Sequence, residues 1–318
     1  MRTLEPRLRT WFRLLMLGRP LPSPEVRAAL GEPLVRDLVK LGLIRERAGR
    51  MDTGGLGLVT YQDRYLVASL DPTYPTAIDP GQTVYVGGSS LHFAGVLPVG
   101  RRSGSVLDLC AGTGLLGILM APQSQHVVCA ELLPEAVNAA RFNVALNGLE
   151  DRVEVREGSL YEPVAKERFD FICVHPPYVA LPAGFGGAPF ADGGPDGMRL
   201  LGPILEGLKD HLAPRGQAML YVQGLGGPSG PFFATHLAEI AARRSLEGQL
   251  LLLDRKSIAD TLRAWGDAST DPQRWATRRR GLLAHFRAGG ASAYYAMLAT
   301  LRRGRGGISI VDAVPRRR

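Results

Sequence analysis

The stretch VLDLCAGTGLLGILM, residues 106–120, decides the fold. A short apolar run, a turn that contains Gly112 and Gly114, and a second apolar run are typical of a strand, a tight turn and a helix. In this arrangement, backbone N–H groups and a helix N-terminus face a ligand. The pattern therefore predicts a nucleotide-binding βαβ unit.

The residues that follow, as far as Gly148, extend this unit. A second apolar strand, 126–130, ends at Glu131, and Pro134 then occupies a position preferred in the first turn of a helix. Gly148 is a typical C-terminal cap for that helix. Glu131 has the spacing from the glycine turn at which an acidic side chain binds ribose hydroxyls.

Two nucleotide ligands fit this pattern. Gly112, Gly114 and Gly117 satisfy G-x-G-x-x-G, so a nicotinamide-dependent dehydrogenase is one alternative. Asp108 favours a different ligand, because a carboxylate before the turn suits an ammonium group and would repel a pyrophosphate. The D-x-x-x-G-x-G pattern, followed by the acidic strand end at Glu131, resembles class I S-adenosylmethionine-dependent methyltransferases.

This resemblance implies an α/β fold with a doubly wound, seven-stranded, Rossmann-like sheet, and S-adenosylmethionine as the cofactor. It also implies that the Asp108 region faces the methionine part and that Glu131 takes the ribose hydroxyls. Ser159 stands where many such enzymes carry an Asp that reads the adenine amino group, and a hydroxyl would make that contact more weakly. The expected cofactor-binding residues are Asp108, Cys110, Ala111, Gly112, Gly114, Glu131, Leu132, Ser159, Leu160 and His175.

The fourth expected strand, 169–174, ends in His175-Pro176-Pro177-Tyr178. Prolines cannot continue a central strand, so the chain must turn there. HPPY resembles the NPPY or DPPY tetrapeptide of methyltransferases that act on planar nitrogen. The downstream ADGGPDG, residues 191–197, resembles the GG-x-DG segment of the HemK-like group, and this resemblance covers residues 106–223. It implies that His175, Pro176 and Tyr178 are the catalytic residues and form the acceptor site.

His175 departs from the family pattern, since it replaces Asn or Asp. A neutral imidazole offers one acceptor and one donor, or it acts as a general base near its unperturbed pKa of ~6.5. The acceptor is therefore expected to be a nitrogen on a protein side chain, a peptide or a small molecule. The alternatives are adenine N6 of RNA or DNA, an oxygen of a small molecule with His175 as base, and a non-catalytic, nucleotide-sensing DNA-binding regulator.

Residues 1–100 are expected to form a separate helical, winged-helix-like module with a hairpin, followed by the methyltransferase domain over 101–318. Helical spacing is present at 10–18, 24–30 and 33–41. The segments 82–88 (QTVYVGG) and 89–95 (SSLHFAG) alternate like the two strands of a hairpin that includes His92. Further strands are expected at 152–156, 217–223, 248–253, 292–301 and 308–311. A helical insertion at about 256–290 could cover the site, bind a partner or mediate dimerisation.

Composition limits the remaining possibilities. The formal net charge is +8, but the arginine clusters at 278–280, 302–305 and 316–318 are short and late, so a nucleic-acid partner is possible but not favoured. Cys110, Cys129 and Cys173 show no metal-ligand spacing and are expected to be buried, reduced thiols, with no metal site. No secretory signal or run of 18 apolar residues is present, so we expect a cytoplasmic protein without a membrane partner.

Overall fold

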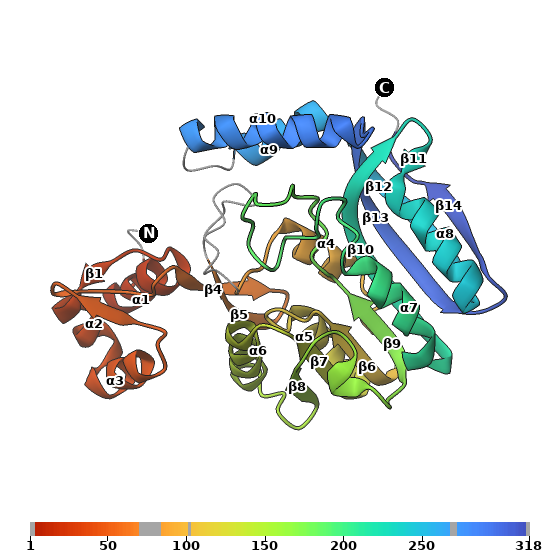
Figure 1. Ribbon diagram of the computed structural model, residues 1–318. Coiled ribbons are helices and arrows are strands. Elements are labelled where there is room, and N and C mark those ends of the chain that lie inside the picture. The colour runs from red at the N-terminus through yellow and green to blue at the C-terminus, as the bar shows by residue number, and fades with distance from the viewer. Residues whose placement is uncertain (1–3, 70–83, 101–102, 268–271, 316–318) are drawn as a thin grey trace.

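The computed structural model describes residues 4–69, 84–100, 103–267 and 272–315. Its centre is a twisted sheet with strand order β14-β12-β13-β10-β9-β6-β7-β8 (Figure 1). The predicted seven strands and the short last one are present, and β11 adds a further pair to β10. The strands are β6 (Ser103–Leu109), β7 (Ser124–Glu131), β8 (Val153–Glu157), β9 (Phe169–Val174), β10 (Leu212–Gly227), β11 (Gly230–Pro231), β12 (Leu246–Ser257), β13 (Ala293–Arg303) and β14 (Gly307–Asp312).

The first five strands of this sheet, from β6 to β10, run parallel, and β13 lies antiparallel between β10 and β12. The chain starts at β6, moves outward to β8, and then returns to β9 on the other side of β6. The order reverses between β6 and β9, and ligands bind in the crevice outside the carboxyl ends of strands at such a switch point. The predicted doubly wound α/β fold is confirmed.

Alternation along the strands creates a hydrophobic core on each face of the sheet. Val106 and Phe171 belong to one buried cluster, whereas Leu107 and Ile172 belong to the other. Because successive side chains of a strand point to opposite faces, one buried strand supplies both cores. The helices that cover these faces are α4 (Gly88–Val96), α5 (Leu115–Met120), α6 (Pro134–Leu146), α7 (Leu201–His211) and α8 (Phe232–Arg244), with short 3-10 turns η2 (Ala121–Gln123) and η3 (Glu162–Val164).

The N-terminal residues form a smaller unit with its own core. Leu14, Leu21, Val26, Ile44 and Met51 are buried together there. Its elements are α1 (Pro6–Trp11), the π-helical turn η1 (Phe12–Met16), β1 (Leu21–Pro22), α2 (Ser23–Leu30), α3 (Glu32–Lys40), β2 (Arg45–Arg47) and β3 (Arg50–Asp52). The strands pair in the order β1-β3-β2, so a small three-stranded sheet accompanies the helices, and we propose that this unit is the winged-helix-like module.

A separate hairpin links this unit to the large sheet. β4 (Leu56–Tyr61) and β5 (Arg64–Ser69) pair antiparallel, and Leu66 is buried in the same cluster as α5. The side chain of Asn143 on α6 accepts a hydrogen bond from the Val67 amide at 2.7 Å and donates one to the Val67 carbonyl at 3.2 Å. We propose that the smaller domain ends at β3, before this hairpin, and not at residue 100.

The predicted hairpin over 82–95 is wrong. Residues 82 and 83 lie outside the described residues, and the second expected strand is the helix α4. Phe93 and Ala94 of α4 are buried against α5 and the sheet, so tertiary packing overrides the alternating pattern. His92 lies on this helix.

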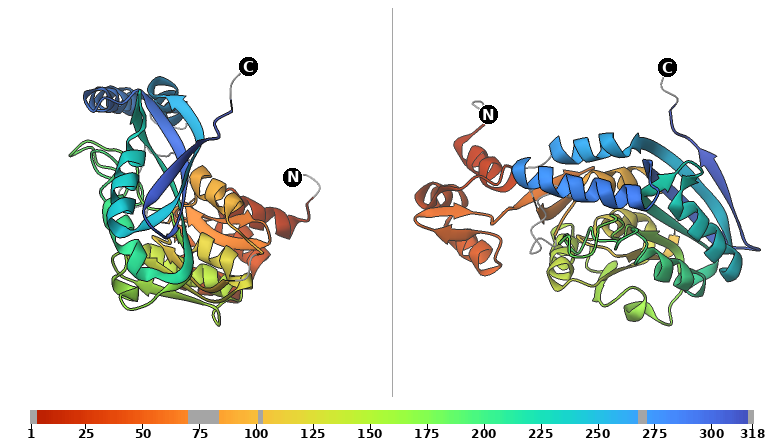
Figure 2. Two further views of the ribbon diagram at one scale, coloured as in Figure 1. Left: turned by 90° about the vertical axis from the view of Figure 1, so that its right-hand side faces the viewer. Right: turned by 45° about the horizontal axis from the view of Figure 1, so that its top comes forward.

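The predicted insertion forms two helices, α9 (Ile258–Asp267) and α10 (Pro272–Ala288), between β12 and β13. They lie side by side at one end of the sheet, on the same side as the carboxyl end of β10 (Figures 1 and 2). Figure 2 shows the N-terminal unit at the opposite end of the molecule from β14. In the described part of the chain, no helix is long and apolar enough to span a membrane.

Candidate functional site

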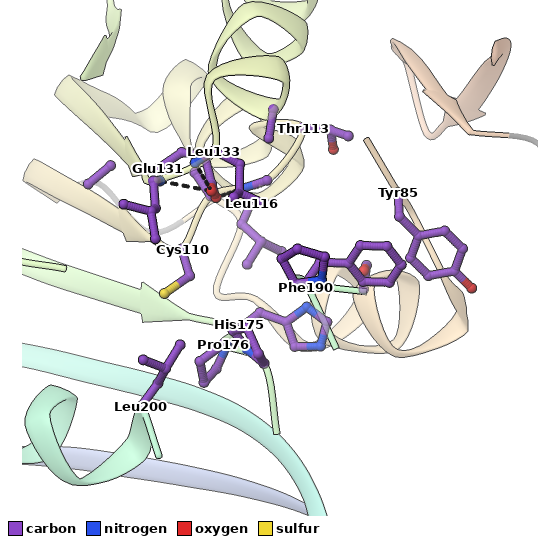
Figure 3. Close-up of a pocket in the computed structure, with 18 of the residues that line it drawn as sticks. Tyr85, Cys110, Thr113, Leu116, Glu131, Leu133, His175, Pro176, Phe190 and Leu200 are labelled. Carbon is purple, nitrogen blue, oxygen red and sulfur yellow. Dashed lines mark hydrogen bonds between the residues drawn. The ribbon is translucent and has the colours of Figure 1, made fainter. Parts of the chain in front are cut away.

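A cavity opens at the carboxyl ends of β6, β7, β8 and β9. It is lined by the predicted Cys110, Ala111, Gly112, Glu131, Leu132, Ser159, Leu160, His175, Pro176 and Tyr178. Two further segments, not predicted for the site, contribute Tyr85, Ser89, Ser90, Pro189, Phe190 and Leu200. Figure 3 shows Glu131 and the glycine turn on one side of the cavity, with His175, Pro176 and Leu200 on the other.

The glycine turn owes its shape to backbone conformations with positive φ. Cys110, Gly112 and Gly114 have φ values of 61°, 55° and 77°. Gly112 and Gly114 adopt this conformation freely, whereas a non-glycine residue such as Cys110 adopts it at some cost. The turn thereby presents its backbone to the cavity and delivers the chain into α5.

Glu131 holds the turn from the end of β7. One carboxylate oxygen accepts a hydrogen bond from the Gly112 amide at 2.8 Å, and the other accepts from the amides of Leu132 and Leu133 at 2.8 and 2.9 Å. The side chain also lines the cavity. Since a carboxylate has about four lone-pair sites, it retains capacity for hydroxyl donors of a ligand.

Asp108 and Gly114 are the two predicted site residues that do not line the cavity. The Asp108 carboxylate is fully buried, and its Oδ2 accepts a hydrogen bond from the Gly117 amide of α5 at 2.8 Å. Burial raises its pKa to about 7. We therefore revise its expected role from contacting the ligand to holding α5 on β6.

Gly117 makes this close packing possible. A Cβ there would lie 2.4 Å from the Sγ of Cys129 and 3.4 Å from the carboxylate of Asp108. Gly114 is the N-cap of α5, and its left-handed backbone conformation turns the chain into the helix. The thiols of Cys129 and Cys173 are buried, and Cys110 is half-buried at the cavity. Burial raises the pKa of all three thiols, so they stay protonated at neutral pH.

His175 stands directly after β9, within a group of aromatic rings. The centre of its imidazole lies 6.1 Å from the Phe93 ring, 5.7 Å from the Tyr178 ring and 5.7 Å from the Tyr221 ring. Burial lowers the pKa of His175 to about 4. The imidazole is therefore neutral at pH 7 and a much weaker base than the value of ~6.5 expected for an unperturbed histidine.

The glycine-rich segment 191–197 fixes the backbone of Tyr178. A Cβ on Gly193 would lie 2.7 Å from the carbonyl carbon of Tyr178, and a Cβ on Gly197, which has φ +80°, would lie 2.5 Å from its carbonyl oxygen. Backbone hydrogen bonds join Val179 to Ala191 and Gly193, and Leu181 to Gly194. Both glycines are needed because two backbones pass in direct contact.

The structure adds aromatic residues that the sequence reading missed. Tyr85 and Phe190 stack with ring centres 4.9 Å apart and planes inclined by 12° (Figure 3). Phe93 and Tyr221 support His175 from α4 and β10. Tyr85 and Phe93 belong to the segments read as a hairpin, which hid their position. The apolar residues of 88–96 are not confined to one side of a helix, so the sequence carried no helical signal for Phe93.

The electrostatics of the cavity are simple. Among the described lining residues, Glu131 is the acidic side chain, and no Lys or Arg is present. No group of three or more His, Cys, Asp or Glu residues suited to a metal ion occurs in the described part of the chain. The described lining therefore carries one acidic side chain, on the Glu131 side, and aromatic rings around His175 that suit a neutral, planar partner.

Residues 87–183 match the family model described as "Methyltransferase small domain". The chain is 37% identical over 121 residues to a ribosomal protein uL3 glutamine methyltransferase of Bradyrhizobium diazoefficiens, which covers 35% of this chain and 38% of that protein. It is 34% identical over 136 residues to a release factor glutamine methyltransferase of Geobacter sulfurreducens, covering 39% of this chain and 47% of that protein. The chain thus matches less than half the length of either relative.

Among solved structures, the chain is similar to Trm5b from Pyrococcus abyssi, with 14% sequence identity and a TM-score of 0.46. That alignment covers 81% of this chain and 61% of the other.

Proposed function

We propose that this chain, whose residues 87–183 match the methyltransferase family model, is a class I methyltransferase resembling the HemK-like group and transfers a methyl group from S-adenosylmethionine to a nitrogen of a protein side chain. The carrying observation is that His175-Pro176-Pro177-Tyr178, Glu131 and the glycine turn line one cavity at the switch point of the sheet. The relatives methylate glutamine in uL3 and in release factors, and a glutamine-like amide is the acceptor we propose.

The cavity residues fit the cofactor. Glu131 offers a carboxylate beside the turn for the ribose hydroxyls, and the backbone of 110–113 together with Ser159 and Leu160 would hold the rest. When bound, S-adenosylmethionine supplies a methyl group on a positively charged sulfur. The absence of lining Lys and Arg side chains within the described cavity matches a cationic ligand better than the pyrophosphate of a nicotinamide dinucleotide.

The acceptor half of the cavity suits a neutral planar group. His175 offers one acceptor and one donor as a neutral imidazole, and the Tyr178 ring lies beside it. An amide N–H that donates to one imidazole nitrogen would be oriented with its lone pair toward the methyl donor. Orientation is the main contribution such a site makes, since aligned reactants react much faster than free ones.

The lowered pKa of His175 bears on the alternative of an oxygen acceptor. A general base is most efficient when its pKa is near the working pH, and a value of about 4 is far from neutrality. An alcohol acceptor is usually deprotonated before it attacks, which this imidazole does poorly. An amide nitrogen that has received the methyl group is instead strongly acidic, so the proton it loses can pass to the neutral His175 imidazole or to water.

The first test is calorimetric binding of S-adenosylmethionine, S-adenosylhomocysteine and NAD to the purified full chain. We expect both sulfur compounds to bind and NAD not to bind. Radiolabelled methyl transfer is then measured to recombinant uL3 and release factor, with total RNA and DNA as the comparison. Label on the proteins that survives acid precipitation and nuclease treatment supports the proposal, whereas label on nucleic acid, or binding of NAD alone, contradicts it.

A further inference from the structure

The segment between Tyr178 and α7, residues 182–200, forms the outer wall of the cavity on the acceptor side. Pro189, Phe190 and Leu200 of this wall segment line the cavity. Phe190 stacks on Tyr85, which belongs to the separate lining segment just before α4. The position of the wall segment therefore sets how open the acceptor side is.

Helix α10 contacts this wall segment at two places. The guanidinium carbon of Arg278 lies 3.9 Å from the centre of the Phe185 ring, and its Nη2 donates a hydrogen bond to the Gly186 carbonyl at 3.0 Å. The second contact is farther along the wall segment, where the Pro195 carbonyl lies 2.6 Å from Nε2 of His285. The contacts span both ends of the part that carries Phe190.

The spacing of these residues makes α10 a firm support. Arg278 and His285 are seven residues apart, which places them on one side of the helix, two turns from each other. Trp275, Leu282 and Phe286 are buried in the core of the large domain. The helix is thus fixed to the sheet by its apolar side and reaches the wall segment with its polar side.

We propose that Arg278 and His285 are positioning residues that hold the wall segment in place for the acceptor, so that α10 sets acceptor affinity without touching the cofactor half of the cavity. This inference rests on the proposed function for its substrate. The contact between α10 and the wall segment is chemically suited to the task, since a guanidinium stacked on a ring and bonded to a carbonyl restrains both a side chain and the backbone.

The test compares Arg278→Ala, Arg278→Lys and His285→Ala with the matched control Arg279→Ala. Arg279 is the next residue in the chain and is exposed, and its substitution by Ala removes the same charge as Arg278→Ala. Hydrogen exchange of peptides covering 183–199 is measured in each full-length variant, together with the KM for the acceptor protein and the affinity for S-adenosylhomocysteine.

For Arg278→Ala and His285→Ala we expect faster exchange within 183–199 and a KM for the acceptor raised roughly tenfold, the loss expected for one such contact. The affinity for S-adenosylhomocysteine and the exchange of α10 itself should not change. Arg278→Lys should restore only part of the effect, because an ammonium keeps the charge and loses the planar fork. Arg279→Ala should behave like the unmodified chain.

Unchanged exchange in 183–199, or an equal rise throughout α9 and α10, would overturn the inference, the second because it means general destabilisation. So would an equal effect of Arg279→Ala, since charge alone would then be the cause. If the unmodified chain bound no sulfur ligand, the proposed function would fail, but the exchange comparison would still decide whether α10 holds the wall segment.

Discussion

Lowering the pH from 7 to 5 should destabilise the protein through His175, and the size of the effect follows from its environment. The pKa is about 4 in the folded chain and 6.5 in the unfolded one. A histidine with a depressed folded-state pKa binds more protons when unfolded, so its contribution to stability is present above 6.5 and is lost as the pH falls toward 4. Between pH 7 and pH 5 this linkage amounts to about 2 kcal/mol.

Asp108 acts in the opposite direction over the same range. Its pKa is raised from 3.8 to about 7, so its stabilising contribution is present below 3.8 and is lost as the pH rises through 7. Lowering the pH from 7 to 5 therefore raises the free energy of unfolding by about 2 kcal/mol through Asp108. The two effects nearly cancel in the unmodified chain, and a single stability profile would hide both.

The difference between two chains separates them. Urea unfolding of the unmodified chain and of His175→Asn is measured at pH 7, 6 and 5, where the linear extrapolation gives the free energy of unfolding. We expect the variant to gain about 2 kcal/mol relative to the unmodified chain between pH 7 and pH 5. His92→Asn, which removes an exposed imidazole on α4, is the matched control. A difference between His175→Asn and the unmodified chain that does not depend on pH would refute the assignment of a buried, neutral imidazole.

Three further predictions concern the cavity. Glu131→Ala should weaken S-adenosylmethionine binding by at least roughly tenfold in calorimetry, because the glycine turn loses its hydrogen bond from Gly112, the amides of Leu132 and Leu133 lose theirs, and the ligand loses a carboxylate; unchanged affinity would count against the pocket. His175→Ala should lower kcat/KM for the acceptor protein roughly 10- to 100-fold, whereas His175→Asn should retain most activity since its amide oxygen accepts the same N–H; equal losses would argue against hydrogen bonding. Gly197→Ala should destabilise the chain by about 1–3 kcal/mol in thermal unfolding, as a Cβ at φ +80° meets the Tyr178 carbonyl oxygen at 2.5 Å; a stability matching that of the unmodified chain would show that the two backbones can separate.

The central sheet was predictable because its signals are local. Apolar runs, glycine turns and Pro134 specify β6, α5, β7 and α6 one after the other. The strand order and the antiparallel place of β13 depend on which runs meet in space, and the sequence alone does not state this. The same limit hid the role of 89–95, where an alternating pattern lost to the packing of Phe93.

Within the site, the turn, Glu131, Ser159 and HPPY were found from their motifs, and they line one cavity. Asp108 was expected at the ligand but does not line the cavity, because a motif gives the position of a residue along a strand and not the hydrogen-bond partner of its side chain. Here the Gly117 amide takes its carboxylate. The wall segment and α10 were not foreseen as neighbours, since their contacts join residues about 90 positions apart.

The side chain of Asn143 on α6 connects three segments: α6 itself, β5 and the glycine turn. Besides its two hydrogen bonds to Val67 in β5, its amide donates to the carbonyl of Thr113 in the glycine turn at 3.0 Å, and the side chain is completely buried. A chain cut at residue 100 would lack β5, and the Asn143 amide directly behind the glycine turn would lose two of these three hydrogen bonds. The hairpin of β4 and β5 thus supports the glycine turn that lines the cavity, and a shortened chain that keeps this support has to begin before the hairpin.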